Sequence, residues 1–550
     1  MPKINQTKKG GIILWDEQDW LAGLHPQNAS STLLSQRNFG NTLASVKNFD
    51  PYRELGYAAP GFSPTDVTTV SQVDTKMRKM VVDDDNSSGQ VAYGITAGDG
   101  AATDARVLKL GTLSADPPVM SAAGNFPHTI AVSGVHAGDD NLVGWDIVSY
   151  TTNVTSTATK GIFYSWGDDV DWDVGFYNIG TDGFDDDFMS GVPTSALAGV
   201  DLTDGQGVEH PMIVGDDDIL YMGSGRQLHG FDGATGADGT FQSQVLTLPT
   251  DYVIQSFAKI ENFLVIFAYK KGAGTSSFFL GEAKAFFWDY LSLDPTRIID
   301  LNDNFVSESF SYKGTVGCFT QGRRTDPGQG KPSKLLIYDG NTFVPVVSFK
   351  ENAPIRGGVV VEGDRIMWLT SDGSSSFVYS WGSPFAGFPT GLNKLTSGSG
   401  SSNGALATIT GTLQVASTGT TTSGGLQEIS NTSRFNSSAI VATSLAEPDL
   451  AFNQRARAKR VTIRYEGVSS GGRDLDLALV DRFGTSTTII TNKATVAASN
   501  KHETFTYDVN GASLPFFDSL KCVLEWGSGS AATAAPMVKS VEVEYEIVEI

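Results

Sequence analysis

The sequence predicts an all-β protein: a β-propeller of about five to seven blades, followed by a C-terminal antiparallel β-sandwich or jelly roll. Short apolar runs separated by Gly- and Asp-containing turns recur through the first two thirds of the chain. The later runs are spaced by roughly 45–50 residues, as four-stranded blades are. Strands of alternating apolar and polar residues fill the last third. The chain also has 61 glycines among 550 residues, which favours many tight turns over long helices.

Three hairpins support the propeller prediction. Residues 216–233 show the pattern best, with an apolar run at 219–222 and a turn at 223–226 before the chain runs back. The pattern returns at 334–346 and at 364–381, where an Asp-Gly pair forms each turn. One hairpin of this kind cannot bury its own apolar face, whereas a ring of hairpins can.

Changes in composition predict the domain boundaries. Residues 1–64 are polar and interrupted by glycine and proline, which predicts an extended N-terminal arm. The propeller is assigned to 65–395 and the sandwich to 406–550, with a Ser/Gly-rich linker at 396–405. Within the propeller, residues 168–193 are rich in aspartate and aromatic residues and predict a long inserted loop.

The charge balance excludes some partners. The chain has 39 Lys and Arg against 61 Asp and Glu, a net charge of −22, which argues against binding a nucleic-acid backbone or anionic lipid. Its two cysteines, Cys318 and Cys522, cannot build a disulfide framework. No apolar run has the length of a signal peptide or a membrane span, so we expect synthesis in the cytoplasm and no membrane anchor.

No catalytic residue is predicted from local motifs. Residues 400–404 fit the G-x-S-x-G pattern, but they lie in a Ser/Gly tract without the strand and helix that a nucleophile elbow needs. The turn at 371–373 approaches a sialidase-type motif with the wrong spacing. The six histidines show no metal-site spacing. Paired carboxylates in a propeller channel remain an open alternative, because the channel gathers side chains from every blade.

One segment is a candidate calcium site. Asp169, Asp171 and Asp173 place carboxylates at alternate positions, as calcium-binding loops do. Gly175 comes one place late for an EF-hand, and Gly180 stands where the closing acidic ligand belongs. Calcium is therefore the one cofactor considered, with solvated acidic turns as the alternative.

Aromatic residues crowd the same segment. They suit a protein interface, stacking against sugars, or packing within the loop. The candidate interface residues there are Trp172, Phe176, Tyr177 and Phe184.

Three features together resemble a known family. Residues 50–53 with Gly56 and 60–61 give a D-P-x-R-x-x-G-x-x-x-P-G-like segment, residues 338–343 give a Y-D-G-x-x-F turn, and residues 455–465 open the sandwich with a basic strand. This layout resembles the propeller-bearing tail proteins of tailed bacteriophages, of the nozzle or tail-hub kind.

The resemblance implies a non-enzymatic structural component of the virion tail, made in the host cytoplasm. Copies would form a ring around the tail axis and contact other virion proteins, and DNA would pass through without specific binding. In the basic strand, Arg455, Arg457 and Arg460 would contact an acidic neighbour, or would simply form an exposed strand face. Two alternatives stay open: a receptor- or glycan-binding module, and a propeller glycoside hydrolase.

Overall fold

The computed structural model places most of the β-strands and turns of the chain. It describes residues 3–7, 10–16, 20, 43–51, 57–66, 77–83, 91–98, 105–110, 125–130, 142–152, 159–167, 172–186, 188, 209–233, 240–270, 282–321, 332–382, 391–397, 404–409, 411–416, 426–429, 438–443, 445–466, 474–493, 503–508, 516–527 and 535–549.

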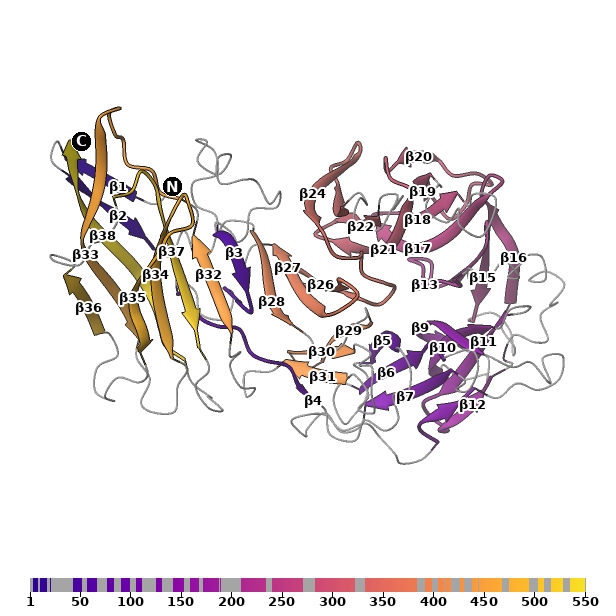
Figure 1. Cartoon of the computed structure of the whole chain (residues 1–550). Coiled ribbons are helices and arrows are strands. Elements are labelled where there is room, and N and C mark those ends of the chain that lie inside the picture. The colour runs from indigo at the N-terminus through magenta and orange to yellow at the C-terminus, as the bar shows by residue number, and fades with distance from the viewer. Residues whose placement is uncertain are drawn as a thin grey trace.

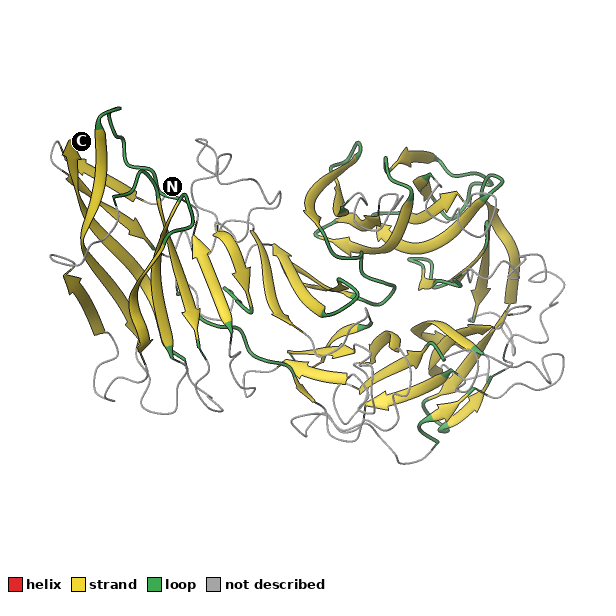
Figure 2. Ribbon diagram, viewed as in Figure 1, coloured by secondary structure: helices red, strands yellow, loops and turns green. Residues whose placement is uncertain are grey.

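The protein is an all-β protein with a β-propeller. Figure 2 shows the described elements as strands joined by loops. In Figure 1 the propeller blades surround a common centre on the right, and the sandwich stands on the left. Among the described residues, no helix has the length and apolar character needed to cross a bilayer.

Seven four-stranded antiparallel sheets among the described residues form the blades. In chain order the first four are blade 1, with β5 (Met77–Asp83), β6 (Val91–Thr96), β7 (Arg106–Leu110) and β8 (His128–Thr129); blade 2, with β9 (Val143–Thr152), β10 (Thr159–Gly167), β11 (Trp172–Asn178) and β12 (Gly183–Asp185); blade 3, with β13 (Met212–Val214), β14 (Leu220–Ser224), β15 (Gln227–Asp232) and β16 (Thr240–Thr247); and blade 4, with β17 (Tyr252–Ile260), β18 (Phe263–Lys270), β19 (Ala283–Trp288) and β20 (Arg297–Asp300).

The remaining three blades complete the ring. They are blade 5, with β21 (Phe305–Tyr312), β22 (Thr315–Gln321), β23 (Ser333–Tyr338) and β24 (Phe343–Phe349); blade 6, with β25 (Val359–Glu362), β26 (Arg365–Ser371), β27 (Ser376–Gly382) and β28 (Gly391–Ser397); and blade 7, with β29 (Leu406–Ile409), β30 (Thr412–Ala416), β31 (Leu426–Ile429) and β4 (Thr65–Asp66).

The first strand of each blade lies innermost. Each of these strands packs against the first strand of the next blade, from β5 through β9, β13, β17, β21, β25 and β29 and back to β5. The ring is closed by hydrogen bonding, because β4 from the N-terminal part of the chain pairs with β31, with Asp66 opposite Gln427 and Thr65 opposite Glu428. Closure of this kind removes the exposed sheet edge that an open array of blades would leave.

The sandwich consists of two five-stranded sheets. Alternating burial along its long strands explains the packing, since one face of each strand meets the core and the other meets water. The first sheet contains β1 (Lys3–Thr7), β2 (Gly10–Trp15), β38 (Met537–Glu549), β33 (Gln454–Glu466) and β36 (Glu503–Asp508); the second contains β3 (Leu43–Lys47), β32 (Ala439–Thr443), β37 (Leu520–Trp526), β34 (Leu475–Asp481) and β35 (Ser486–Lys493).

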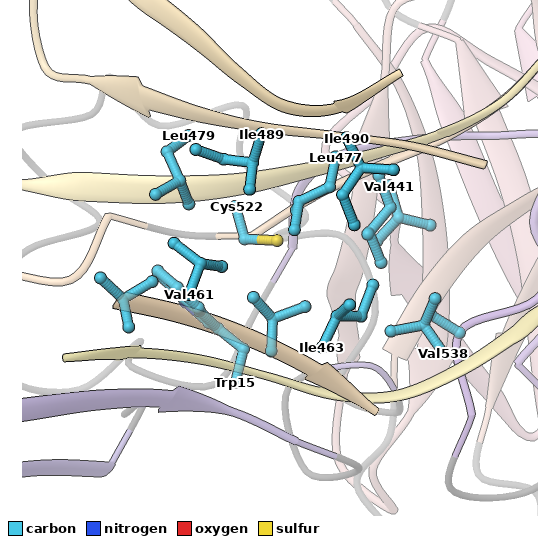
Figure 3. Packing of buried hydrophobic residues seen from close by; sticks show 14 of the residues in the cluster. Trp15, Val441, Val461, Ile463, Leu477, Leu479, Ile489, Ile490, Cys522 and Val538 are labelled. Carbon is cyan, nitrogen blue, oxygen red and sulfur yellow. The ribbon is translucent and has the colours of Figure 1, made fainter. Parts of the chain in front are cut away.

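The sandwich core lies between these two sheets. Figure 3 shows Val461 and Ile463 of one sheet facing Leu477 and Cys522 of the other, with Trp15 beside them. Trp15 is fully buried, so an N-terminal strand supplies one of the largest side chains of this core.

The N-terminal segment differs from the predicted extended arm. Strands β1, β2 and β3 belong to the sandwich, and the residues described after β3 are held by two isolated bridges, Phe49 to Pro60 and Ala58 to Val538. The physical reason is that 10–15 carries an apolar face, with Ile13 and Trp15 fully buried, which is stable only when paired with β38.

Two further boundaries are corrected. Strands β29, β30 and β31 lie in the range assigned from the sequence to the sandwich, but they belong to blade 7. The predicted inserted loop at 168–193 contains the two outer strands of blade 2 instead, because β11 pairs with β10 over its whole length and with β12 on its other side. The alternating Asp and aromatic residues there are a strand pattern.

The sandwich and the propeller meet at blade 6. Strand β3 packs beside β28, the Phe49 backbone N–H donates to the Lys394 carbonyl at 3.0 Å, and Arg365 lies 3.6 Å from Asp50. Figure 1 shows β3 and β28 side by side at this junction.

Candidate functional site

A repeated irregularity marks the beginnings of the innermost strands. Four of these strands carry one extra residue near their start: Arg78 in β5, Trp145 in β9, Gln255 in β17 and Ser307 in β21. A β-bulge leaves its extra residue outside the ladder and turns the strand locally, so it changes the direction of the side chains around it. The bulges therefore occur where the strands line one end of the propeller centre.

Charged and polar side chains from six blades converge at this end. We call this cluster the hub. Its members are Arg78 and Lys79 of β5, Asp146 of β9, Glu209 before β13, Gln255 of β17, Glu308 of β21 and Arg356 before β25.

Arg356 lies at the middle of the hub. Its Nε and Nη2 donate to Glu209 Oε2 at 3.1 and 2.9 Å, and its Nη1 lies 3.4 Å from Asp146 Oδ2. Blade 6 is not a neighbour of blades 2 and 3 in the ring, so these contacts are made across the propeller centre. Burial alone would lower the pKa of Arg356, but the charges of Glu209, Asp146 and Glu308 more than offset it and raise that pKa.

Asp146 is the most tightly held carboxylate of the hub. Its Oδ1 accepts from Lys79 Nζ at 2.5 Å and from the Ile147 N–H at 2.7 Å, and its Oδ2 accepts from the Met212 N–H at 2.8 Å. With a side chain only 1% exposed, it is fixed in position by both blades 1 and 3.

Glu209 is the most accessible carboxylate of the hub, since 18% of its side chain is exposed. Besides Arg356, it contacts Arg78 Nη1 at 3.4 Å and accepts from Gln255 Nε2 at 2.8 Å. Arg78 also lies over the Trp145 ring, 5.2 Å from its centroid. Residues of blades 1, 4 and 6 thus hold the Glu209 carboxylate in place at the exposed side of the hub.

Glu308 has a different environment. Its Oε1 accepts the Ser309 N–H at 2.9 Å and its Oε2 accepts the Gly357 N–H at 2.6 Å. Burial raises the pKa of this carboxyl despite the opposing charges of Arg356 and Lys79. The hub therefore holds one carboxyl that retains its proton to higher pH beside two carboxylates in direct ion pairs.

Gly357 positions Arg356 against blade 1. Its φ is +72°, and a Cβ built there would lie 2.5 Å from the Arg78 carbonyl oxygen. Only glycine fits both the left-handed backbone and this close approach.

The hub is reachable from solvent on one side. The side chains of Arg78 and Lys79 are 18% and 26% exposed, whereas Arg356 is 3% exposed. Three acidic and three basic side chains balance one another, so the hub carries no net formal charge when all are ionised.

His210 follows the hub residue Glu209 in the chain and has a buried side chain. Its Nδ1 lies 3.2 Å from the Gly223 carbonyl, and its ring stacks on Trp172 with centroids 4.2 Å apart. Burial is the main cause that lowers its pKa to about 3, and the positive charge of Arg356 adds to it. The imidazole is therefore neutral at ordinary pH.

Of the three residues predicted to bind calcium, the structure describes one. Asp169 and Asp171 lie outside the described residues, and Asp173 is a buried strand residue whose Oδ1 accepts the Val174 N–H at 2.6 Å. Within the described ranges, no group of three or more His, Cys, Asp or Glu residues could hold a metal ion.

The predicted aromatic interface in blade 2 is corrected. Trp172, Phe176 and Tyr177 are buried at 3%, 6% and 1% exposure, so they pack within and between blades and are not available to a partner. Phe184 is half-buried and stacks on the His128 ring at 3.7 Å. Internal packing, one of the alternatives from sequence, accounts for all four.

The predicted basic strand lies on the sandwich surface, about half exposed. Arg460 pairs with Glu544 at 2.7 Å and Arg457 pairs with Glu546, both of β38, while Arg455 lies 3.8 Å from Asp518. These arginines thus meet acidic residues of their own chain, and a contact with another protein stays a prediction.

Sequence reasoning missed every hub residue. These residues lie at or just before the start of an innermost strand, in segments with no sequence in common, and no short motif joins residues so far apart. The one available signal was the general one, that a propeller channel collects carboxylates from several blades.

Comparisons with known proteins agree on the fold alone. No protein-family model matches the sequence, and no curated protein does. Among solved structures, the Dos1 propeller is 10% identical, with 68% of this chain and 96% of that chain covered and a TM-score of 0.40. A Trypanosoma rangeli sialidase mutant displaying trans-sialidase activity is 9% identical, with 92% and 95% covered and a TM-score of 0.34. An exo-β-1,3-galactanase from Phanerochaete chrysosporium is 8% identical, with 88% and 100% covered and a TM-score of 0.29.

The prediction of a non-enzymatic phage tail protein is corrected, because nothing in these comparisons points to a tail protein; by name, the solved structures are a propeller, glycoside hydrolases and a sialidase. The prediction that the chain is not an enzyme is corrected with it. At these identities and TM-scores the likeness carries no argument about activity, so the function has to be argued from the hub.

Proposed function

We propose that the protein is a glycoside hydrolase whose active site is the hub. The observation that carries the proposal is the meeting of three carboxyl groups, from Asp146, Glu209 and Glu308, around Arg356 at the propeller centre. Glycoside hydrolysis uses two carboxyl groups, one that protonates the leaving oxygen and one that acts as base or nucleophile. Because the hub places its carboxyl groups in unlike environments, it can supply both the proton donor and the base or nucleophile.

Glu308 is assigned the role of general acid. Burial raises its pKa, so it keeps a proton to higher pH than an ordinary glutamate. Each of its oxygens accepts one backbone N–H, and a carboxyl oxygen has a second lone-pair position where the proton can sit.

Glu209 is assigned the role of base or nucleophile. It is the most accessible of the three carboxylates, and Arg78, Arg356 and Gln255 fix its position. Asp146, held by Lys79 and two backbone N–H groups, acts as a positioning residue that orients Arg356.

The ion pairs of the hub support an uncharged sugar as substrate, even though a protonated Glu308 leaves the hub with one positive charge in excess. A site with an excess of arginine would favour a carboxylated or phosphorylated sugar, but here each cation already faces a carboxylate. Polar groups that are fixed before substrate binds act on the transition state without a reorganisation cost.

A substrate screen tests this proposal. The full-length protein is incubated with a panel of p-nitrophenyl glycosides and neutral oligosaccharides, and released p-nitrophenol and reducing sugar are measured. We expect turnover of at least one substrate by the wild type and by Glu525→Gln, an exposed carboxylate of the sandwich that serves as the matched control.

Two results would overturn the proposal. Cleavage that survives in both Glu209→Gln and Glu308→Gln would place the active site elsewhere. Saturable glycan binding without any cleavage would favour the glycan-binding alternative.

A further inference from the structure

A cavity lies away from the hub, between blades 4 and 5. It has a volume of about 500 Å³, which is within the usual range for small-molecule sites. Its principal lining residues are Glu261, Phe263, Phe287, Arg297, Tyr338 and Asp339.

The cavity is on the opposite face of the propeller from the hub. Hub residues stand near the first residues of the innermost strands, whereas the cavity is lined by the turns that follow β17 and β21, at Glu261 and Gly314. Along β21, the four residue steps from Glu308 to Tyr312 already span roughly 13 Å at the rise of a β-strand, and the turn that lines the cavity follows Tyr312. The two sites are therefore separate.

Aromatic rings form the apolar wall of the cavity. Phe263 and Phe287 pack edge to face with centroids 6.3 Å apart, and Phe287 and Tyr338 are 5.3 Å apart. Phe287 and Tyr338 belong to the core between the two blades, and Phe263 is only half-buried against it. The core thus opens to solvent at this point.

Arg297 completes the wall but is already engaged. Its Nη1 donates to the Tyr338 hydroxyl at 2.5 Å and to the Gly340 carbonyl at 3.2 Å, and its Nη2 donates to the Asn341 carbonyl at 2.5 Å. The guanidinium also lies over the rings of Phe287 and Tyr338. An anionic ligand would have to break these contacts and approach two carboxylates, so the cavity disfavours anions.

The rim offers hydrogen-bond acceptors. Glu261 is exposed at the tip of its turn, with φ of +49°. Asp339 is exposed as well, and its Oδ1 accepts the N–H groups of Asn341 and Thr342, which fixes the carboxylate in place. Thr296 is exposed just before β20; its hydroxyl donates to the Phe287 carbonyl at 3.0 Å, and the hydroxyl oxygen can still accept.

We propose that this cavity binds an uncharged sugar unit of an oligosaccharide. A pyranose ring presents an apolar C–H face, which packs on aromatic rings, and hydroxyl groups, which donate to carboxylates. The cavity combines both features and carries no free cation for an acidic group among the described lining residues. The inference goes beyond the proposed function, because a site on the opposite face would hold a glycan without cleaving it.

Isothermal titration calorimetry of the full-length protein, which measures the dissociation constant of each sugar, tests the inference. The probes are cellotetraose, xylotetraose, maltotetraose and laminaritetraose, with Glu308→Gln in the background so that no probe is hydrolysed. We expect saturable binding of at least one probe, weakened at least tenfold by Thr296→Trp, which fills the cavity from an exposed position.

A second variant shows whether weaker binding by Thr296→Trp could come from misfolding. Glu261→Gly removes the rim carboxylate at a positive φ that glycine adopts readily, so the fold is retained and binding should again weaken. The matched control Glu525→Gln should bind as the parent does.

The inference is overturned if Thr296→Trp binds as tightly as the parent, or if no sugar probe binds. It is also overturned if tetramethylammonium, a probe for an organic cation, binds more tightly than the sugars. Failure here is distinguishable from failure of the proposed function. Thr296→Trp and Glu261→Gly in an otherwise wild-type chain keep the hub intact, and their turnover of p-nitrophenyl glycosides reports the hub alone.

Discussion

Arg356 and Glu209 form a forked ion pair across the propeller centre, with Nε and Nη2 of the arginine 3.1 and 2.9 Å from the same carboxylate oxygen. Removing one partner of a buried pair typically costs about 3–5 kcal/mol, and here Glu209 keeps weaker compensation from Arg78 and Gln255. We therefore expect Arg356→Met to lower the free energy of unfolding by up to about 3–5 kcal/mol, measured from urea titration followed by fluorescence.

Arg455→Met is the matched control for this prediction. Arg455 is half exposed and lies 3.8 Å from Asp518, so its loss should change the free energy of unfolding by about 0–1 kcal/mol. Equal small effects for both variants would show that the central ion pair does not hold the blades together.

The pH dependence of turnover should depend on Glu308. A general acid works only while protonated, so the rate of the wild type should fall as pH rises through the raised pKa of this carboxyl. In Glu308→Gln the alkaline decline should disappear and the rate at the optimum should drop roughly 10²–10⁴-fold. An unchanged alkaline decline in the variant would assign the proton donor to another group.

His210 should make the protein sensitive to acid. Its folded-state pKa of about 3 lies below the ordinary histidine pKa of 6.5, so the unfolded chain takes up a proton first as pH falls. Stability is fully present above pH 6.5 and is lost below it, at about 1.4 kcal/mol per pH unit for this one proton. His229, with a pKa of about 4, contributes in the same direction.

The variant His210→Gln isolates this effect. Between pH 6.5 and 5.5 the free energy of unfolding of the variant should fall less steeply than that of the wild type, whatever its absolute stability. Parallel slopes over this window would mean that His210 does not remain neutral in the folded protein.

Trp15 tests whether the N-terminal strands are part of the sandwich. It is fully buried between the two sheets, so Trp15→Ala should cost about 3–5 kcal/mol. Phe452→Ala is the control, because Phe452 is fully exposed and its loss should change stability by less than about 0.5 kcal/mol. Comparable stability of the two variants would contradict an integral N-terminal strand.

Local signals predicted the hairpins well. The Asp339-Gly340 and Asp372-Gly373 turns are present, with Gly340 and Gly373 at φ of +99° and +89°. The run at 219–222 contributes to β14. Turn chemistry and apolar alternation act over a few residues, so they can be found without the rest of the chain.

Long-range pairings could not be found in this way. Strand β4 pairs with β31 although more than 300 residues separate them, and β2 pairs with β38 near the opposite end of the chain. Their registers are set by which exposed edges remain once the blades and sheets have formed. The predicted self-association and virion location stay predictions.

The hub was hidden for the same reason. Asp146, Glu209 and Glu308 stand in unrelated local sequences, and what they share is a position near or just before the start of an innermost strand. The number of blades determines which strands surround the propeller centre, and the bulges at Gln255 and Arg78 change which side chains of those strands point into it.

The most direct measurement of the central claim is the initial rate of reducing-sugar release by Glu209→Gln and Glu525→Gln, compared with the wild type on the same neutral oligosaccharide. The hub account predicts a loss of roughly 10²–10⁴-fold for Glu209→Gln and a wild-type rate for Glu525→Gln. A wild-type rate for Glu209→Gln, with its fold intact by circular dichroism, would contradict the assignment of the hub as the active site.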